Sequence, residues 1–423
     1  FADMHDGSKF NLDWMNYIQA NCIWLQPIHP SAETSRGDPS GYEPGSPYAT
    51  RDYFAVSKWL GRDGTESGAM TEFTNFVLAC DTYTGSVGSI NIMLDGVFNH
   101  TAWDAVMGQG GADLFGSSAS AAMGSTRPGW YSLWTDYGEP ATFYNGVYDN
   151  DFATAPDRGD FGKWADVAEL YFGKYSALVR HNDEDNANFK NEGDVYDFTG
   201  MSTNTKDLWK YFGYYADFWL KQTGHAGTNS WVSELDSKGL DALRCDFGQG
   251  LPPQFWEFFI NHTRAMKWNF VFMAETLDGG IPGYRSNRHF DILNEDLVFK
   301  FTQAHISQAH EFKAAYEQRR NAYNGGGVLL NLTGHDEVMP YSDAWQTASR
   351  YGCNAMIDGL PMIFYGQEKG IQPAYSDTGT YNQGFEKFEL NFGKYIVNFK
   401  QWNKATFWDN APTNSTGMDQ WYG

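Results

Sequence analysis

The chain of 423 residues lacks any long apolar run and carries few basic side chains. No stretch approaches the roughly 18 consecutive apolar residues that a transmembrane helix needs, so the sequence predicts no membrane span. Lys and Arg number 30 against 52 Asp and Glu, which gives a formal net charge of −22. Because that charge would repel phosphates, a nucleic-acid partner is excluded. The charge favours a neutral or cationic partner.

Cysteine is also scarce, with four residues and no CxxC pair among them. Each lies in an apolar, regular-looking segment, so we expect free thiols in the core rather than disulfides or a metal cluster. They are Cys22, Cys80, Cys245 and Cys353. No signal peptide precedes Phe1, which favours a fragment or a processed form of a longer chain. Aromatic residues are abundant instead, and their flat faces suit sugar rings as well as protein cores.

Apolar segments of strand length alternate with amphipathic segments of helix length through most of the chain. We predict strands at 22–25, 90–94, 240–246, 269–275, 290–293, 328–332 and 361–365. We predict helices at 11–20, 70–80, 207–220, 253–267, 298–320, 343–357 and 392–402. Eight such β/α units would close a (β/α)8 TIM barrel, whose active site lies at the carboxyl ends of the strands. Since seven strands are visible, we expect the first one to precede Phe1.

Regular patterning fails between residues 101 and 204, which are rich in Gly, Asp, Ser and aromatic residues. A gap of that length exceeds an ordinary loop, so we interpret it as a small inserted domain B after the third barrel strand. The predicted organisation is therefore the first part of the barrel at 1–100, domain B at 101–204, the rest of the barrel at 205–405 and a C-terminal remnant at 406–423. Residues 1–10 are expected to form a polar loop. The residues Asp3, His5 and Asp6 there suit a solvated turn better than a metal loop.

Two neighbouring strand candidates end in carboxylates. Segment 240–246 ends in Asp246, and segment 269–275 ends in Glu275, with a predicted helix between them. Strand, helix, strand is a βαβ unit with parallel strands, so both carboxylates should emerge side by side at one rim. Two close carboxyl groups cannot both ionise easily, so one is pushed toward the protonated acid. This suits a glycosidase, although capping and metal binding are alternative reasons for acids at strand ends.

Further polar blocks follow other strand candidates and would converge on the same cavity in a closed barrel. Taken in order, the blocks resemble conserved regions of the α-amylase family of retaining glycoside hydrolases. They are 95–100, 239–246, 275–279 and 335–336, with a weaker match at 164–170. The resemblance runs from Phe1 to about Trp402. It implies the barrel with its inserted domain, while the usual C-terminal β-sandwich is mostly or wholly absent from this chain.

The resemblance implies roles for three carboxylates. Asp246 would be the nucleophile that forms a covalent glycosyl-enzyme, and Glu275 the acid and then the base. Asp336 would hold the sugar's 2- and 3-hydroxyls and stabilise the positive transition state. Arg244, counted with the substrate-binding residues, can donate to Asp246 and keep it ionised. Asp95 is expected to be structural, with its carboxylate near Arg244.

The resemblance also implies substrate and metal contacts. Tyr48 matches a sugar-stacking tyrosine, and His100 and His335 can hydrogen-bond ring hydroxyls as the ring flattens. Asn99 and Asp166 match ligands of a Ca²⁺ ion between barrel and domain B, which oxygen ligands suit.

Two departures from the family pattern leave alternatives open: Gly334 replaces an Asn, and Gln249-Gly250 replaces Lys-His. The favoured function is a retaining α-glucan hydrolase cleaving α-1,4 bonds of starch, glycogen or maltooligosaccharides. An α-glucan transglycosylase, of the glucanotransferase or branching type, would use the same catalytic residues. A non-catalytic sugar-binding protein of amylase fold is a third alternative, disfavoured by the intact carboxylates. We expect a monomer, secreted or periplasmic because a polymer substrate cannot cross membranes.

Overall fold

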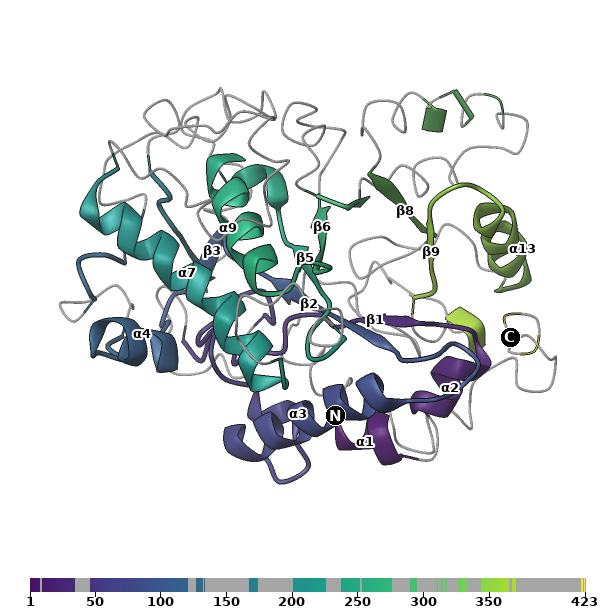
Figure 1. Ribbon diagram of the computed structural model, residues 1–423, viewed down its shortest axis with the longest axis horizontal. Coiled ribbons are helices and arrows are strands. Elements are labelled where there is room, and N and C mark those ends of the chain that lie inside the picture. Colours follow the sequence, from purple (N-terminus) through teal and green to yellow (C-terminus); the bar gives the residue numbers. More distant parts are fainter. Residues whose placement is uncertain are drawn as a thin grey trace, which may run out of the picture.

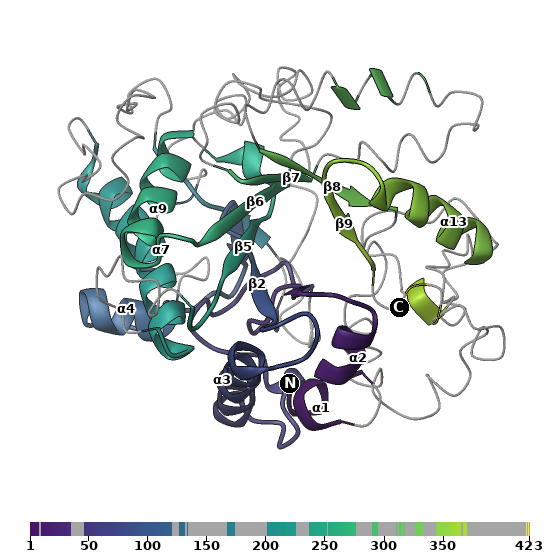
Figure 2. The ribbon, with the colours of Figure 1, turned by 45° about the vertical axis from the view of Figure 1, so that its right-hand side comes forward.

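A seven-stranded parallel sheet forms the centre of the computed structural model (Figures 1 and 2). The structure describes residues 1–7, 10–34, 46–120, 127–131, 133, 167–173, 201–225, 237–251, 253–275, 290–294, 310, 313–314, 316–317, 326–332, 344–364, 367–369, 420 and 422. The strands are β1 (Cys22–Trp24), β2 (Asn91–Gly96), β5 (Ala242–Cys245), β6 (Val271–Glu275), β7 (Ile292–Asn294), β8 (Gly327–Asn331) and β9 (Leu360–Met362). They lie in chain order, each parallel to its neighbour, and the sheet curls into a half-barrel. The seven predicted strands are confirmed, as is the parallel β/α architecture.

In the described part of the chain, helices precede five of these strands, as crossovers between parallel neighbours require. They are α2 (Leu12–Tyr17) before β1, α3 (Glu66–Thr82) before β2, α7 (Thr203–Gln222) before β5, α9 (Pro253–Met266) before β6 and α13 (Ala344–Ala355) before β9. Helices α7 and α9 pack side by side over one flank of the sheet (Figure 1). The helix predicted at 298–320 is described only at 310, 313–314 and 316–317, all of them helical. The helix predicted at 392–402 lies outside the described residues.

The central strands β2, β5 and β6 bury both faces. On β2, Ile92 and Leu94 pack outward into the core shared with the helices, while Met93 points into the barrel interior. The interior cluster contains Met93, Ala242, Met273, Ile292 and Leu329, with Trp24, Val271 and Met362 packed against it. Double-sided burial explains why these strands are nearly continuous apolar runs in the sequence.

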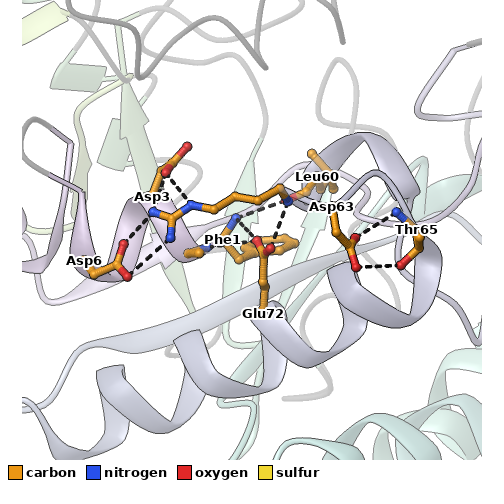
Figure 3. A network of polar contacts seen from close by, with 9 residues as sticks. Phe1, Asp3, Asp6, Leu60, Asp63, Thr65 and Glu72 are labelled. Carbon is orange, nitrogen blue, oxygen red and sulfur yellow. Dashed lines mark hydrogen bonds and ion pairs between the residues drawn. The ribbon is translucent and has the colours of Figure 1, made fainter.

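The N-terminal segment differs from the prediction. Residues 1–10 were expected to form a polar loop, but Ala2–Asp6 form helix α1. Asp3 and Asp6 are three residues apart, so a helix brings both to one face. There both carboxylates contact the guanidinium of Arg62, with Asp3 Oδ1 accepting from Nε at 2.9 Å (Figure 3). Arg62 therefore lies where a cation would sit in the metal-loop alternative.

Packing against α3 supports the same helix. The ring of Phe1 lies 4.9 Å from that of Phe73 and 5.8 Å from that of Phe76. The backbone nitrogen of Ala2 donates to Glu72 Oε2 at 3.3 Å (Figure 3). The partners stand about 70 positions away in the chain, which is why local patterning did not reveal the helix.

Part of the predicted domain B is described, at 101–120, 127–131, 133, 167–173 and 201–204. Strand β3 (His100–Ala102) pairs antiparallel with β4 (Val167–Glu169), and helix α4 (Gly108–Phe115) follows β3. The amide of Leu170 donates to the carbonyl of Asn99 at 3.1 Å. This segment is therefore attached directly to the turn that follows β2. The boundaries of domain B stay a prediction.

The four cysteines are free, as predicted. Cys80 and Cys245 are buried, but Cys22 and Cys353 are exposed, so the prediction of core positions is wrong for these two. Cys22 opens β1, which is an edge of the described sheet, and Cys353 lies on the outer helix α13. Among the described residues, no helix is both long and apolar enough to span a bilayer.

Candidate active site

Strands β5 and β6 bring the two predicted catalytic carboxylates together. Their register pairs Cys245 with Ala274. The next residue is Asp246 after Cys245 and Glu275 after Ala274. The amide of Asp246 donates to the carbonyl of Gly96 at 3.1 Å, which ties this position to the end of β2. The placement of both acids at one rim, inferred from the βαβ pattern, is confirmed.

A single buried guanidinium joins these carboxylates. Arg244 Nη1 lies 2.6 Å from Asp246 Oδ1, and Nη2 lies 3.0 Å from Glu275 Oε2. Nη1 also lies 2.9 Å from Asp95 Oδ1, so three acids share one cation. Burial lowers the pKa of Arg244, but the carboxylates of Asp95, Glu275 and Asp246 together hold it well above its ordinary value. The predicted contacts of Arg244 with Asp246 and Asp95 are confirmed.

An unforeseen backbone contact also orients Glu275. The amide of Phe247 donates to Glu275 Oε2 at 2.6 Å. Phe247 adopts a left-handed conformation with φ 45°, which costs an L-residue about 1–2 kcal/mol. This conformation turns the chain sharply at Phe247, directly after the amide that donates to Glu275. Nothing in the sequence marks Phe247, because aromatic residues seldom adopt this conformation.

Two aromatic residues complete the surroundings of Arg244. The Tyr48 hydroxyl donates to Asp95 Oδ2 at 2.9 Å, and Trp24 Nε1 donates to the same oxygen at 3.2 Å. The guanidinium carbon of Arg244 lies 5.3 Å from the Trp24 ring centroid and 5.7 Å from that of Tyr48. Tyr48 is therefore at the rim where the family resemblance expects it. Trp24 was not foreseen as a site residue.

Asn99 and His100 follow β2 at the same rim. The buried hydroxyl of Tyr53 lies 2.8 Å from the carbonyl oxygen of Val97 and 2.9 Å from that of His100. This hydroxyl therefore holds the two ends of the turn together, and the turn carries Asn99 and His100. Asn99 Nδ2 lies 3.4 Å from His100 Nδ1.

The side chain of Asn99 meets one requirement of a calcium ligand. Its Oδ1 is buried and has no hydrogen-bond partner among the described residues. A carboxamide oxygen in that condition fits Ca²⁺, which prefers oxygen ligands. The second predicted ligand, Asp166, lies outside the described residues, directly before β4. Within the described part of the chain, no group of three or more His, Cys, Asp or Glu residues could hold a metal ion.

The departure from the family pattern at Gly250 has a steric reason. A Cβ at this position would stand 2.1 Å from the Phe247 ring and 2.6 Å from Asn99 Oδ1. Any side chain here would displace one of the two. Three further positions lie outside the described residues, beyond the end of β8. They are the predicted site residues His335 and Asp336, and Gly334, which replaces the Asn of the family pattern.

Comparison with known proteins found similarity in sequence and in fold. No family model matches the chain. The curated Alpha-amylase 2 of Schwanniomyces occidentalis is 21% identical over 374 residues, covering 85% of this chain and 57% of the relative. The chain therefore spans less than two thirds of that relative's length.

Two solved structures share the fold. An α-amylase from Lactobacillus plantarum aligns with a TM-score of 0.54 at 19% identity, covering 92% of this chain and 74% of that one. A cyclic alpha-maltosyl-(1→6)-maltose hydrolase from Arthrobacter globiformis aligns with a TM-score of 0.51 at 17% identity, covering 94% and 72%. The predicted (β/α)8 fold class is confirmed. The resemblance to the α-amylase family is confirmed too, by this fold together with a curated α-amylase relative.

Proposed function

We propose that this protein is a retaining α-glucan hydrolase that cleaves α-1,4 bonds of starch, glycogen or maltooligosaccharides. One observation carries the proposal: Asp246 and Glu275 end adjacent parallel strands and contact the same buried guanidinium of Arg244. Glycoside hydrolysis with retention needs two such carboxyl groups, one as the nucleophile and one as the acid and base. The named activities of the similar proteins, an α-amylase and a maltosyl-maltose hydrolase, support an α-glucan substrate.

The proposed reaction has two displacement steps. In the first, Asp246 attacks the anomeric carbon while Glu275 protonates the departing glycosidic oxygen, which leaves a covalent glycosyl-enzyme. In the second, Glu275 takes a proton from water, whose oxygen attacks the same carbon and releases Asp246. Two inversions retain the configuration. Since Glu275 Oε2 accepts from Arg244 and from the Phe247 amide, we assign the transferred proton to Oε1.

The remaining predicted residues belong to the same proposal. Asp336 would bind the 2- and 3-hydroxyls, and Tyr48, His100 and His335 would contact the sugar ring, with Arg244 orienting the nucleophile. The hydroxyl of Tyr48 is engaged with Asp95, so its ring rather than its oxygen would meet the sugar. A secreted or periplasmic location belongs to the same proposal, because an external starch polymer could not cross a membrane to reach the enzyme.

A calcium ion is part of the proposal, supported by the buried Oδ1 of Asn99. Asn99 and Asp166 would hold it through their oxygen atoms. When bound, the ion would stabilise the attachment of the segment before β4 to the turn after β2.

Product analysis tests the proposal. Incubation with maltoheptaose, followed by chromatography and a reducing-end assay, should give shorter oligomers with rising reducing ends. Longer or branched products at constant reducing ends would instead identify a transglycosylase. No change with any α-glucan would leave a non-catalytic sugar-binding protein.

Replacing the nucleophile tests the assignment within the site. Asp246→Asn should lower kcat/KM on the order of 10⁴-fold, because an amide cannot form the glycosyl-enzyme. Asp207→Asn on α7 is the matched control, since the ion pair of Asp207 in the described part of the chain is a 3.8 Å contact with Lys210. Wild-type activity in Asp246→Asn would remove Asp246 from its role.

A further inference from the structure

Trp24, the last residue of β1, links the barrel interior to the rim. Its side chain packs against the interior cluster that contains Met93, Ala242 and Met273. From there its indole Nε1 donates to Asp95 Oδ2 at 3.2 Å. The indole is thus held from below by apolar packing and presents its only donor upward to the network around Arg244.

Asp95 receives donors on both oxygens. Oδ1 accepts from Arg244 Nη1 at 2.9 Å, while Oδ2 accepts from the Tyr48 hydroxyl at 2.9 Å and from Trp24. The Asp95 side chain is almost completely buried, at 0% exposure. Donors from three different segments fix the plane of this carboxylate, and with it the direction from which Oδ1 meets the guanidinium. The Trp24 ring adds a second contact, 5.3 Å from the guanidinium carbon of Arg244.

We propose that Trp24 is a positioning residue that holds Asp95 and Arg244 in the orientation that Asp246 and Glu275 require. The inference rests on the proposed function for the reaction it serves. Indole suits the task because it donates one hydrogen bond, accepts none and does not titrate. Tyr48 also donates to Asp95 Oδ2, and its ring is proposed to contact the sugar. Trp24 adds a hydrogen bond from strand β1, where its ring packs against the interior cluster of the barrel.

The test compares two tryptophans that both donate to a carboxylate. Trp24→Phe keeps an apolar ring and removes the N–H. Trp14→Phe is the matched control, since Trp14 Nε1 donates to Glu368 Oε1 at 3.1 Å between α2 and the turn Gln367–Lys369. Rates are measured on a maltooligosaccharide that the wild-type protein cleaves. Trp24→Phe should lower kcat about 10-fold to 100-fold with KM within about twofold, because misorientation acts on the reacting groups.

Replacing Trp24 by β-(3-benzothienyl)alanine gives a second variant, in which a sulfur takes the place of the N–H and the bicyclic shape is kept. It tests the hydrogen bond without leaving a cavity, so it answers the question even where Trp24→Phe folds poorly. The same loss of kcat is expected, of about 10-fold. A kcat equal to that of the wild type or of Trp14→Phe overturns the inference.

A double-variant cycle shows whether Trp24 acts through Asp95. An amide has one acceptor oxygen, so Asp95→Asn cannot serve both sides, and the losses from Trp24→Phe and Asp95→Asn should not multiply. Multiplying losses would overturn the route through Asp95.

The same four proteins can be compared by urea unfolding, a measurement that does not depend on activity. We expect the effects of Trp24→Phe and Asp95→Asn on the unfolding equilibrium constant to be coupled by about 5-fold or more. A wild-type protein inactive on every α-glucan would sink the proposed function. Absent coupling, with an active wild-type protein, would sink this inference alone.

Discussion

The two ends of the strands use buried charge differently. At the amino ends, the Lys267 ammonium is fully buried and lies 2.9 Å from one carboxylate, that of Asp241, while backbone carbonyls take its other donors. At the carboxyl ends, Arg244 is shared among the acids Asp95, Asp246 and Glu275. The first arrangement balances one charge with one, and the second gathers acids around one cation.

The acids at the amino ends act on the backbone. Asp241 Oδ2 accepts from the amide of Ile92 at 2.9 Å, which fixes β5 against β2. Asp291 Oδ2 accepts from the amide of Phe272 at 2.7 Å and from Arg264 Nη2 at 2.6 Å, which fixes β7 against β6. These pairs hold strand register, so this end serves stability, while the opposite rim is arranged for chemistry.

The largest effect is expected at the rim. Arg244→Met leaves three clustered carboxyl groups, two of them buried, without their cation. Activity should therefore fall on the order of 10⁴-fold, and the free energy of unfolding by about 3–5 kcal/mol. Arg244→Lys restores the charge but not the fork that reaches Asp246 and Glu275 together, so most of the rate loss should persist. Steady-state kinetics with urea unfolding checks both, and an active Arg244→Lys would contradict the shared-guanidinium account.

The matching change at the amino ends should separate stability from catalysis. Lys267→Met leaves the half-buried Asp241 without its cation and the Lys238 and Leu240 carbonyls without their donor, so it should lower the free energy of unfolding by about 3–5 kcal/mol. Below its melting temperature the variant should keep kcat within about threefold of the wild type, because the rim contacts are untouched. A rate loss comparable to that of Arg244→Met would abolish the distinction between the two ends.

The loss of stability at acidic pH should come from a third region, where buried His29 contacts helix α7. His29 is buried, with Nδ1 3.0 Å from the Ala55 carbonyl and Nε2 3.0 Å from the Tyr215 hydroxyl. Desolvation lowers its pKa to about 4, although the hydrogen bond to Ala55 raises it. Since the unfolded state binds the proton more readily, this stability is present above the unfolded pKa of about 6.5 and is lost as pH falls toward 4.

The loss amounts to about 3 kcal/mol over that window. His29→Gln should be less stable at pH 7 and should show a flatter pH dependence of unfolding between pH 6.5 and 4. Urea unfolding across this range is the measurement. An unchanged slope would place the acid sensitivity elsewhere.

The smallest effect is expected where stability and site meet. Tyr53→Phe removes the hydroxyl beside the Val97 and His100 carbonyls and should cost about 1–2 kcal/mol of stability. It should also lower kcat/KM several-fold, because the turn carrying His100 loosens. Tyr211→Phe loses a 3.1 Å hydrogen bond to the Met107 carbonyl. It should lower the free energy of unfolding by a similar amount and leave kcat/KM unchanged. Equal kinetics in the two variants would make Tyr53 a purely structural residue.

The positions of residues that depend on short sequence segments could be predicted. Asp246 and Glu275 could be placed at one rim because each ends a recognisable strand and a helix joins the strands. Arg244 could be paired with Asp246 because they stand two apart on one strand, on the same face. Helix α1, the left-handed turn at Phe247 and the contact of Trp24 with Asp95 were missed, since each depends on partners that are remote in the chain or on a conformation that no pattern reports.

The sequence by itself determined the alternation of strands and helices, their parallel direction and the acids at the strand ends. These follow from side-chain periodicity and from the handedness of βαβ connections, which are properties of short segments. Only the tertiary structure decided that Glu275 shares the guanidinium of Arg244 and that Trp24 donates to Asp95. That meeting depends on strand register, which is fixed by contacts between segments as far apart as Asp241 and Ile92.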